Sequence, residues 1–317
     1  MNPLSLVICT CLGVLAMAAA LLPIAWLASR ILPGRRTAIA FITLTVLVAL
    51  TACALVKGSR PPVVTHVTVS LANLPPDASG FTLVQLSDLH LGRLTRLDRL
   101  HAIVGQVNAT AADLVVITGD LADADAGRDG EFCEGLKPIS ARHGVVAVPG
   151  NHDYAAGIER FLRLARCSNI TVLRNERLSI GGAIQVAGLD EAAGRSFAEG
   201  GPNLDKALAG CDPGRPVVLL WHMPYGFDRA ARKHVDLQLS GHTHGGQIPP
   251  MDLLVWLTTP YSSGFYEKGG SRLYVSDGTG TWGPPMRLFS RNEIVRFTLV
   301  RPHAARPDLG GLHQHDR

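Results

Sequence analysis

Charged side chains are absent from two long stretches at the start of the sequence. None occurs from Met1 to Ser29, and none occurs from Thr37 to Val56. Each stretch is long enough to cross the roughly 30 Å hydrocarbon layer of a bilayer as a helix. The mean hydropathy of +0.19 is high for a wholly soluble protein, and the excess lies in these stretches. The sequence therefore predicts two transmembrane helices.

The first stretch lacks the basic start and the short length of a secretory signal peptide. Pro23 interrupts it, but a membrane helix tolerates a proline near one end. The second stretch leaves an alternative open. Arg35 and Arg36, the apolar residues after them and the Leu50–Cys53 segment resemble a lipoprotein signal that ends at a lipid-modified Cys53.

Basic residues are few around the two stretches and unevenly placed. Arg30, Arg35 and Arg36 lie between them, whereas Lys57 and Arg60 follow the second. Because cytoplasmic loops are enriched in Lys and Arg, this bias predicts a cytoplasmic linker. The remainder of the chain would then be an extracytoplasmic domain of an integral protein of the cell (inner) membrane. The lipoprotein alternative puts the domain on the same side.

Other features are scarce or missing. The net charge is only +4, and no basic stripe with interleaved aromatics occurs, so no nucleic-acid partner is expected. No Cys-x-x-Cys spacing occurs among the six scattered cysteines, so no disulfide framework is expected. Cys133, Cys167 and Cys211 lie beyond the apolar stretches, and their odd number leaves at least one unpaired.

Beyond the membrane segment, strand-like runs alternate with helical spacing. Strands are expected at 63–71, 81–87, 113–118, 144–148, 170–173, 178–188 (a hairpin), 216–221, 235–239, 272–276 and 293–300. Helices are expected at 94–107, 155–165, 203–208 and 227–233. Residues 121–130 are expected to form a loop, and 247–270 an irregular segment. The alternation predicts an α/β domain with central sheets flanked by helices.

The sequence divides into four parts: a membrane segment (1–57), a linker with the first strand (58–79), a domain (80–300) and a tail (301–317). The tail is rich in Pro, Arg, His and Gly, which predicts disorder. Residues 251–266 hold many large apolar side chains. Two interpretations stay open for them: they pack over a sheet edge as core, or they are exposed and touch lipid.

Polar residues gather where five predicted strands end. They belong to the segments Asp88-Leu89-His90, Gly119-Asp120, Gly150-Asn151-His152-Asp153, Trp221-His222 and Gly241-His242-Thr243-His244-Gly245-Gly246. Loops after the carboxyl ends of strands are where α/β folds build their sites. Two divalent metals about 3.5–4 Å apart need oxygen and nitrogen ligands from several elements. The series therefore predicts a two-metal site.

Each segment alone has an ordinary explanation. A lone Asp-x-His arises by chance, Gly-Asn-His-Asp can be a turn, and a histidine beside Trp221 fits a core. All five segments in order, each after a strand-like run, are better explained by one shared site. In an extended segment Asp88 and His90 would point to the same side and reach one ion, and His242-Thr243-His244 repeats this spacing.

The series resembles the calcineurin-like metallophosphoesterase superfamily, whose pattern is D-x-H, G-D, G-N-H-[DE], H and G-H-x-H. The resemblance covers roughly residues 80–245. Residues 241–247 and 278–287 also resemble the membrane-associated branch that includes bacterial phosphodiesterases of the YkuE and YaeI type. The resemblance implies a sandwich of two mixed sheets flanked by helices, with 80–300 as the catalytic domain.

The resemblance also implies a role for each motif residue. One ion would be held by Asp88, His90 and His244. Asp120 would bridge both ions. The other ion would be held by Asn151, His222 and His242. His152 would act as general acid or stabilise charge on the phosphoryl oxygens, and Asp153 would hold His152. The cofactor would be two divalent ions, Mn, Fe or Zn.

The implied activity is that of a metal-dependent phosphoric ester hydrolase acting on a phosphodiester or related phosphate ester. Two cations lower the pKa of a bridging water, so that hydroxide attacks phosphorus near neutral pH. The membrane anchor adds a lipid-linked phosphate ester to the candidate substrates. Two alternatives are kept: a nucleotide-sugar lipid pyrophosphatase of lipid A-type synthesis, which needs a cytoplasmic site, and a non-catalytic membrane scaffold. None of the nine motif positions is lost, which disfavours the scaffold.

Overall fold

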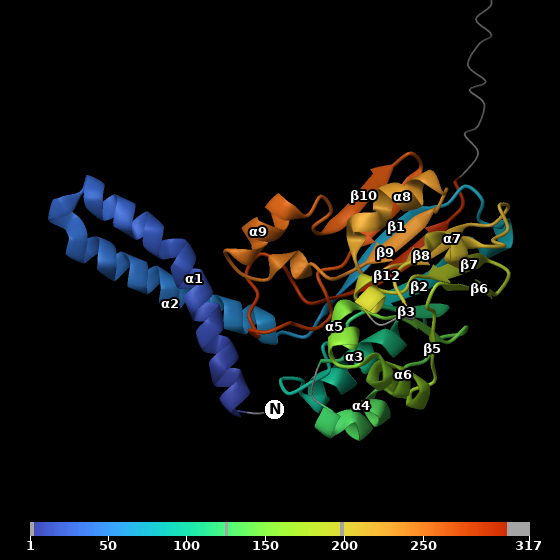
Figure 1. Cartoon of the computed structure of the whole chain (residues 1–317), viewed down its shortest axis with the longest axis horizontal. Helices are drawn as coiled ribbons and strands as arrows, with labels where there is room; N and C mark the ends of the chain where they lie inside the picture. Colours follow the sequence, from blue (N-terminus) through green and yellow to red (C-terminus); the bar gives the residue numbers. More distant parts are fainter. Residues whose placement is uncertain (1–2, 124–125, 197–199, 303–317) are drawn as a thin grey trace, which may run out of the picture.

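Two long apolar helices form a hairpin that projects from one end of the domain (Figure 1). A computed structural model of the chain describes residues 3–123, 126–196 and 200–302. Helix α1 (Pro3–Ile31) turns through η1 (Pro33–Arg35) into α2 (Arg36–Ser59). By length and composition both helices can cross a membrane, which confirms the prediction of two such helices.

Two mixed six-stranded sheets form the domain, as the family resemblance implies. The first has the order β1-β12-β2-β3-β4-β5, with β1 at Val63–Ser70, β12 at Glu293–Val300, β2 at Phe81–Leu86, β3 at Leu114–Thr118, β4 at Val145–Val148 and β5 at Ile170–Val172. The second has the order β10-β11-β9-β8-β7-β6, with β10 at Gly264–Lys268, β11 at Ser271–Val275, β9 at Leu237–Ser240, β8 at Val217–Leu220, β7 at Ile184–Gly188 and β6 at Glu176–Ile180. Strand β1 pairs with β12, so this part of the 58–79 segment belongs to the first sheet.

The main core lies between the sheets. Val116 and Val146 of the first sheet belong to the same buried cluster as Val186 and Leu220 of the second. Every residue of β2, β3, β4, β7, β8 and β9 is buried. Strands covered on both faces need such continuous apolar runs, which is why the sequence shows short runs here instead of alternation.

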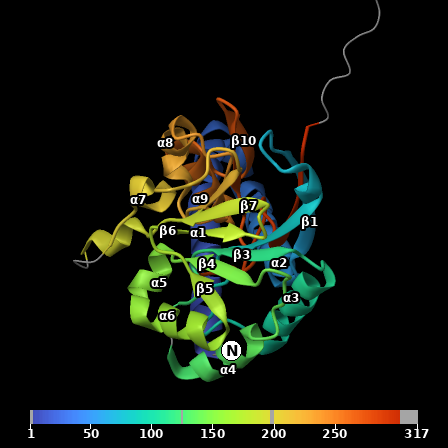
Figure 2. The ribbon, with the colours of Figure 1, turned by 90° about the vertical axis from the view of Figure 1, so that its right-hand side faces the viewer.

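Helices cover the outer faces of both sheets (Figure 2). Helices α3 (Leu97–Ala109), α4 (Asp129–Leu136) and α6 (Ile158–Cys167) pack on the first sheet in a second buried cluster. Helices α7 (Leu204–Leu208) and α8 (Phe227–Arg232) contribute Leu204 and Ala230 to a cluster on the second sheet. The result is the predicted sandwich with helices outside.

Three local predictions differ from the structure in part. The loop expected over 121–130 ends in α4, whose Phe132 and Leu136 are buried against the first sheet. The helix expected over 155–165 corresponds to α6 but begins later, at Ile158. Gly157, with φ +96°, separates it from the short α5 (Asn151–Ala155). The segment 247–270 contains α9 (Met251–Thr258) and β10, and β10 is ordered by antiparallel pairing with β11.

Helix α9 exposes its apolar side chains. None of its residues is buried, and Trp256 and Leu257 are 69% and 63% exposed. Of the two interpretations of residues 251–266, exposure therefore holds for α9, whereas Tyr261 and Tyr266 pack against a buried cluster of the second sheet and α8. Helix α9 lies at the end of the domain that faces the hairpin (Figure 1).

The end of α2 is fixed to the domain. Lys57 Nζ donates to the carbonyl of Leu288 at 2.8 Å, and the backbone N–H of Arg287 donates to the carbonyl of Ala54 at 3.0 Å. Met17 of α1 packs in a buried cluster with Met286. These contacts hold the hairpin against the loop that precedes β12.

One disulfide joins Cys133 on α4 to Cys167 on α6. Cys211 is free, which confirms that at least one domain cysteine is unpaired. A single bond is not a framework, in line with the sequence. The predicted disorder of the tail concerns residues that, from 303 onward, lie outside the described part of the chain.

Candidate metal centre

All five motif segments meet at one edge of the sandwich. Strands β2, β3 and β4 run parallel in the first sheet, as do β8 and β9 in the second. Their carboxyl ends present the predicted residues: Asp88 and His90 after β2, Asp120 after β3, Asn151, His152 and Asp153 after β4, His222 after β8, and His242 and His244 after β9. The structure therefore brings the five segments together in space.

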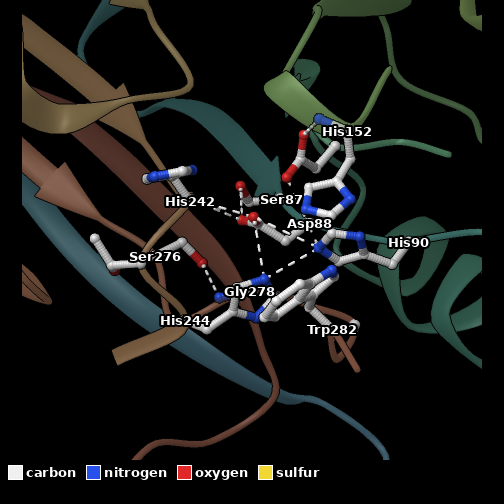
Figure 3. A network of polar contacts seen from close by, with 12 residues as sticks. Ser87, Asp88, His90, His152, His242, His244, Ser276, Gly278 and Trp282 are labelled. Carbon is white, nitrogen blue, oxygen red and sulfur yellow. Dashed lines mark hydrogen bonds and ion pairs between the residues drawn. The ribbon is translucent and has the colours of Figure 1, made fainter. Parts of the chain in front are cut away.

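A first cluster comprises Asp88, His90 and His244, which are all buried. His244 Nε2 lies 3.4 Å from Asp88 Oδ1, and His90 Nε2 lies 4.0 Å from the same oxygen. The two Nε2 atoms are 3.1 Å apart. Figure 3 shows the Asp88 carboxylate between His90 and His242, with His244 on a third side. Three ligand atoms thus converge on one point.

A second cluster comprises Asp120, His222 and His242, with Asn151 between the rings. His222 Nε2 lies 3.2 Å from Asp120 Oδ2. Asn151 Oδ1 is 3.1 Å from His222 Nε2 and 2.9 Å from His242 Nδ1. Oxygen and nitrogen donors again converge, this time from the loops after β3, β4, β8 and β9.

Asp120 lies between the two clusters. Its Oδ2 is 3.2 Å from His222 Nε2 in the second cluster and 3.8 Å from His90 Nε2 in the first. Its Oδ1 accepts the backbone N–H of His152 at 2.8 Å, which fixes the carboxylate. A carboxylate within reach of histidine rings from both groups occupies the position that a bridging ligand requires.

Outer hydrogen bonds orient the ligand rings. His222 Nδ1 donates to the carbonyl of Thr118 at 2.8 Å, which leaves the Nε2 lone pair for the second cluster. His90 Nδ1 donates to Asp123 Oδ1 at 2.9 Å, which leaves its Nε2 for the first. A ring held in this way presents its other nitrogen as a ligand before any ion arrives.

Asp123 also contacts His152, and Asp153 does not. Asp123 Oδ1 lies 3.2 Å from His152 Nδ1. The Asp153 carboxylate instead accepts the backbone N–H groups of Gly150 at 2.8 Å and Ala122 at 2.9 Å. Asp153 therefore fixes the loops after β3 and β4, and Asp123 takes the place beside His152 that was expected of Asp153. No signal in the sequence singled out Asp123, which lies in the segment expected to be a loop.

The backbone at the site differs from the extended geometry expected for the two His-containing motifs. Asp88 and His90 have φ of +53° and +47°, and His242 and His244 have φ of +74° and +53°. Asp120 has φ +51° as well. Left-handed backbone at non-glycine residues costs of order 1–3 kcal/mol each and clusters at functional sites. The pairs converge because of these turns, not because of strand alternation.

Two glycines allow the loops to approach the carboxylates. A Cβ on Gly150 would lie 2.1 Å from Asp120 Oδ1, and a Cβ on Gly241 would lie 2.3 Å from Asp88 Oδ2. Neither contact is possible for a larger residue without displacing a carboxylate. The glycines before Asn151 and His242 are therefore required by close packing around the donors.

The charges at the centre shift the pKa values of the donors in different directions. Burial raises the pKa of Asp120, but the adjacent His222 outweighs it and holds that pKa well below its usual range. Burial lowers the pKa of His242 to about 4 and that of His244 well below its ordinary value. Burial also lowers the pKa of His90 and of His222, but the neighbouring carboxylates outweigh it and raise both, so an ion bound by these two rings would displace a proton.

The donor set fits two divalent cations. Two buried carboxylates of like charge are costly unless a cation lies nearby. His90 and His244 also direct one nitrogen each at the same point. Mixed imidazole, carboxylate and amide donors suit Mn, Fe or Zn. Two such groups of donors joined by Asp120 provide for two ions.

Arg287 and Trp282 complete the site and come from the loop before β12. The buried Arg287 guanidinium donates through Nη2 to the carbonyls of Asp277 and Gly280, both at 2.7 Å, and lies 3.2 Å from His244 Nδ1. The Trp282 ring packs edge-on against His152, with centroids 5.5 Å apart. Both residues fall in the segment 278–287 that resembled the membrane-associated branch, but no role was predicted for them.

Comparisons with known proteins agree with this geometry. Residues 81–246 match the calcineurin-like phosphoesterase family. The chain is 38% identical over 225 residues to an uncharacterized metallophosphoesterase of Helicobacter pylori strain J99, covering 70% of this chain and 60% of that protein. It is 37% identical over 279 residues to a transmembrane protein with metallophosphoesterase domain of Bos taurus, covering 83% and 62%. It is 32% identical over 246 residues to the uncharacterized metallophosphoesterase YkuE of Bacillus subtilis, covering 74% and 84%.

The chain spans about three fifths of the length of the first two relatives. Among solved structures, a dimetal phosphatase from Danio rerio has a TM-score of 0.43 and 16% identity, covering 69% of this chain and 99% of that one. A 5'-nucleotidase precursor from Thermus thermophilus has a TM-score of 0.44 and 17% identity, covering 68% and 54%. At this identity the likeness concerns the fold alone.

Proposed function

Because this chain belongs to the calcineurin-like phosphoesterase family, we propose that it is a membrane-anchored, metal-dependent hydrolase of phosphodiesters or related phosphate esters. The family works with two divalent metal ions, and the clustered donors fit them. The observation that carries the proposal is the position of Asp120, whose Oδ2 lies within 3.8 Å of a histidine from each cluster.

The ligands are proposed to divide as the family pattern implies. Asp88, His90 and His244 hold one ion, Asp120 bridges, and Asn151, His222 and His242 hold the other. When bound, such ions stabilise charge on the phosphoryl oxygens and supply a water of lowered pKa. The catalytic domain is proposed to be 80–300, behind the membrane segment 1–57 and the linker with the first strand at 58–79.

His152 is proposed to act on the substrate and not on the ions. Its side chain is 26% exposed, whereas those of His90 and His222 are buried. Asp123 Oδ1 accepts from Nδ1 of His152, so Nε2 is left for a phosphoryl oxygen or the leaving group. A proton held at Nε2 can be donated to the departing alkoxide. Asp153 is proposed to contribute indirectly, by fixing the loop that carries His152.

The membrane is proposed as a partner of the whole chain. Two membrane-length helices, an exposed apolar α9 and relatives named as transmembrane proteins support this. An extracytoplasmic domain in the cell membrane is supported by the linker arginines, because cytoplasmic loops are enriched in Lys and Arg. The alternative of a nucleotide-sugar lipid pyrophosphatase requires the opposite orientation. Nucleic acid is not proposed as a partner.

Membrane orientation is tested by fusions after residue 302. An alkaline phosphatase fused there is expected to be active, and a fluorescent protein that matures only in the cytoplasm is expected to show no fluorescence. Replacing Arg35 and Arg36 by Gln should weaken that orientation, since these residues carry the positive-inside bias. The reverse pattern of fusions would place the site in the cytoplasm and favour the pyrophosphatase.

Hydrolysis is tested with the full chain in phosphatidylcholine nanodiscs and bis-p-nitrophenyl phosphate. Activity with Mn²⁺ is expected, with loss on chelation and recovery when Mn²⁺ is returned. The scaffold alternative predicts no turnover under any metal condition. Turnover that survives exhaustive chelation would contradict the proposed metal dependence.

A further inference from the structure

One cavity joins the candidate metal centre to the membrane hairpin. It has a volume of about 990 Å³. His90, Asp123 and His152 line it at the metal centre, while Leu6 and Cys9 of α1 line it at the hairpin. That volume is at the upper end of the roughly 300–1,000 Å³ of typical small-molecule sites. A compound bound here would touch the reacting site and the membrane helices together.

The two ends of the cavity differ in chemistry. Beside His152 it is lined by polar and aromatic groups, including the half-exposed Trp282. Toward the hairpin it is lined mainly by apolar side chains of three helices, with a few polar and charged residues of the same helices such as Ser59 and Asp98. The apolar ones are Leu6 and Cys9 on α1, Leu55 and Val56 on α2, and Ile103 on α3. A ligand that matches both ends has an anionic phosphate at one end and a hydrocarbon chain at the other.

Arg99 of α3 lies in the cavity wall between the two ends. Its Nη1 donates to the carbonyl of Gly58 at 3.0 Å, which fixes the guanidinium against the end of α2. Its Nη2 is buried and, among the described residues, has no hydrogen-bond partner. The half-buried Arg99 brings a positive charge to this wall, and a guanidinium is suited to an anionic oxygen of a ligand.

The wall formed by α1 and α2 indicates how such a ligand would enter. Both helices are long and apolar enough to lie in a bilayer, and most of their large apolar side chains are exposed. A water-soluble substrate would gain nothing from walls of this kind, whereas a hydrocarbon chain gains about 0.8 kcal/mol per buried methylene.

We propose that this cavity binds the hydrocarbon chain of the substrate, so that the substrate is a phosphate ester of a lipid. The reactive phosphate lies at the metal centre, Arg99 contacts the oxygens of the linking region, and the chain lies against α1, α2 and α3. This substrate class rests on the hydrolase function proposed above. The cavity itself is an observation independent of that activity.

The test uses alkyl p-nitrophenyl phosphodiesters with methyl, butyl and octyl groups, below their micelle concentrations. These compounds share one leaving group and differ only in chain length. The full chain in phosphatidylcholine nanodiscs, loaded with Mn²⁺, should show kcat/KM at least about tenfold higher for the octyl than for the methyl compound. A kcat/KM that does not rise with chain length would overturn the proposal.

Two matched pairs of variants test where the hydrocarbon chain of the substrate binds. Cys9 lines the cavity, whereas Cys11, two residues on in α1, is exposed and does not. Cys9→Trp should abolish the octyl advantage and leave methyl turnover within about twofold of wild type, whereas Cys11→Trp should change neither. Ala102 and Ala109 form a second pair, because both are exposed on α3 and only Ala102 lines the cavity. Ala102→Trp should act like Cys9→Trp, and Ala109→Trp should act like wild type.

Calorimetric binding of octyl phosphate and methyl phosphate to the same nanodiscs separates the two proposals. Tight binding of octyl phosphate that Cys9→Trp weakens at least about tenfold would support the lipid cavity. If no ester were hydrolysed in that case, only the hydrolase proposal would fail. If the methyl ester is hydrolysed but octyl phosphate and methyl phosphate bind equally well, the lipid-cavity proposal would be wrong and the hydrolase proposal would stand. Equal loss of methyl and octyl turnover in both Cys9→Trp and Ala102→Trp would also overturn it.

Discussion

The candidate metal centre has two halves on either side of Asp120: the first contains Asp88, His90 and His244, and the second contains His222, His242 and Asn151. The two halves contain similar donors but are supported in different ways. In the first half, His90 is oriented by a carboxylate, with Nδ1 2.9 Å from Asp123 Oδ1. In the second half, His222 is oriented by a main-chain carbonyl, with Nδ1 2.8 Å from Thr118 O. A carboxylate raises the basicity of an imidazole more than a neutral carbonyl does. We infer that the first half is the more sensitive to side-chain substitution.

The halves also differ in their neighbouring charges. The ring of His244 lies beside the Arg287 guanidinium, whose pKa is lowered to about 10 by burial. In the second half, Asn151 Oδ1 lies between His222 and His242 and brings no charge. The first half is also connected to His152, because Asp123 contacts both His90 and His152. Ion binding and substrate chemistry are thus linked on one side of the centre.

The largest effect is expected for Asp120→Ala, which removes the group shared by both halves. Both ions should be lost or strongly depleted by elemental analysis. The rate on bis-p-nitrophenyl phosphate should fall by more than the roughly 10²–10⁴-fold that loss of a general acid costs. Full retention of one ion together with near-normal turnover would show that Asp120 belongs to one half only.

His152→Ala should have the next largest effect and should leave the two halves intact. Both ions are expected to stay, because the His152 ring is not among the donors that converge on Asp120. The rate should fall by roughly 10²–10⁴-fold if His152 is the general acid. His66→Ala, an exposed histidine on the edge strand β1, is the control for loss of an imidazole. Metal loss as severe as in Asp120→Ala would contradict this division of roles.

Asp123→Asn is the substitution that best separates the halves, with a smaller effect. It keeps the shape of the side chain but removes the charge that supports His90. Removing such an outer partner costs roughly 10–100-fold in metal affinity or activity. One ion should therefore dissociate more readily than the other in a chelator titration, and Asp77→Asn at an exposed position should behave as wild type. An equal loss of affinity for both ions would contradict the proposed difference between the two halves.

The sequence predicted the parts of the site that depend on local pattern. Apolar β-branched runs located most strands, because strands buried on both faces need them. The polar residues that end those runs, from Asp88 to His244, come together because parallel strands place their carboxyl ends at one edge. The order of the elements predicted central sheets flanked by helices, whereas the sandwich of two mixed sheets was implied by the family resemblance.

The sequence could not predict features that depend on tertiary contacts. Asp123 lies in a polar segment expected to be a loop, and nothing in its local pattern shows that it faces His90 and His152. Arg287 reaches His244 from 43 positions away. The left-handed backbone at Asp88 and His242 is held by packing, and the strand β10 exists through its pairing with β11. Periodicity carries no information about such contacts.

The most direct test of the two-ion centre is metal content per chain. The full protein, purified with Mn²⁺ and dialysed, is measured by elemental mass spectrometry alongside Asp120→Ala and His152→Ala. We predict close to two ions per chain for wild type and for His152→Ala, and fewer than one for Asp120→Ala. A wild-type ratio near zero, with no activity restored by added metal, would contradict the assignment of this site as a dinuclear metal centre.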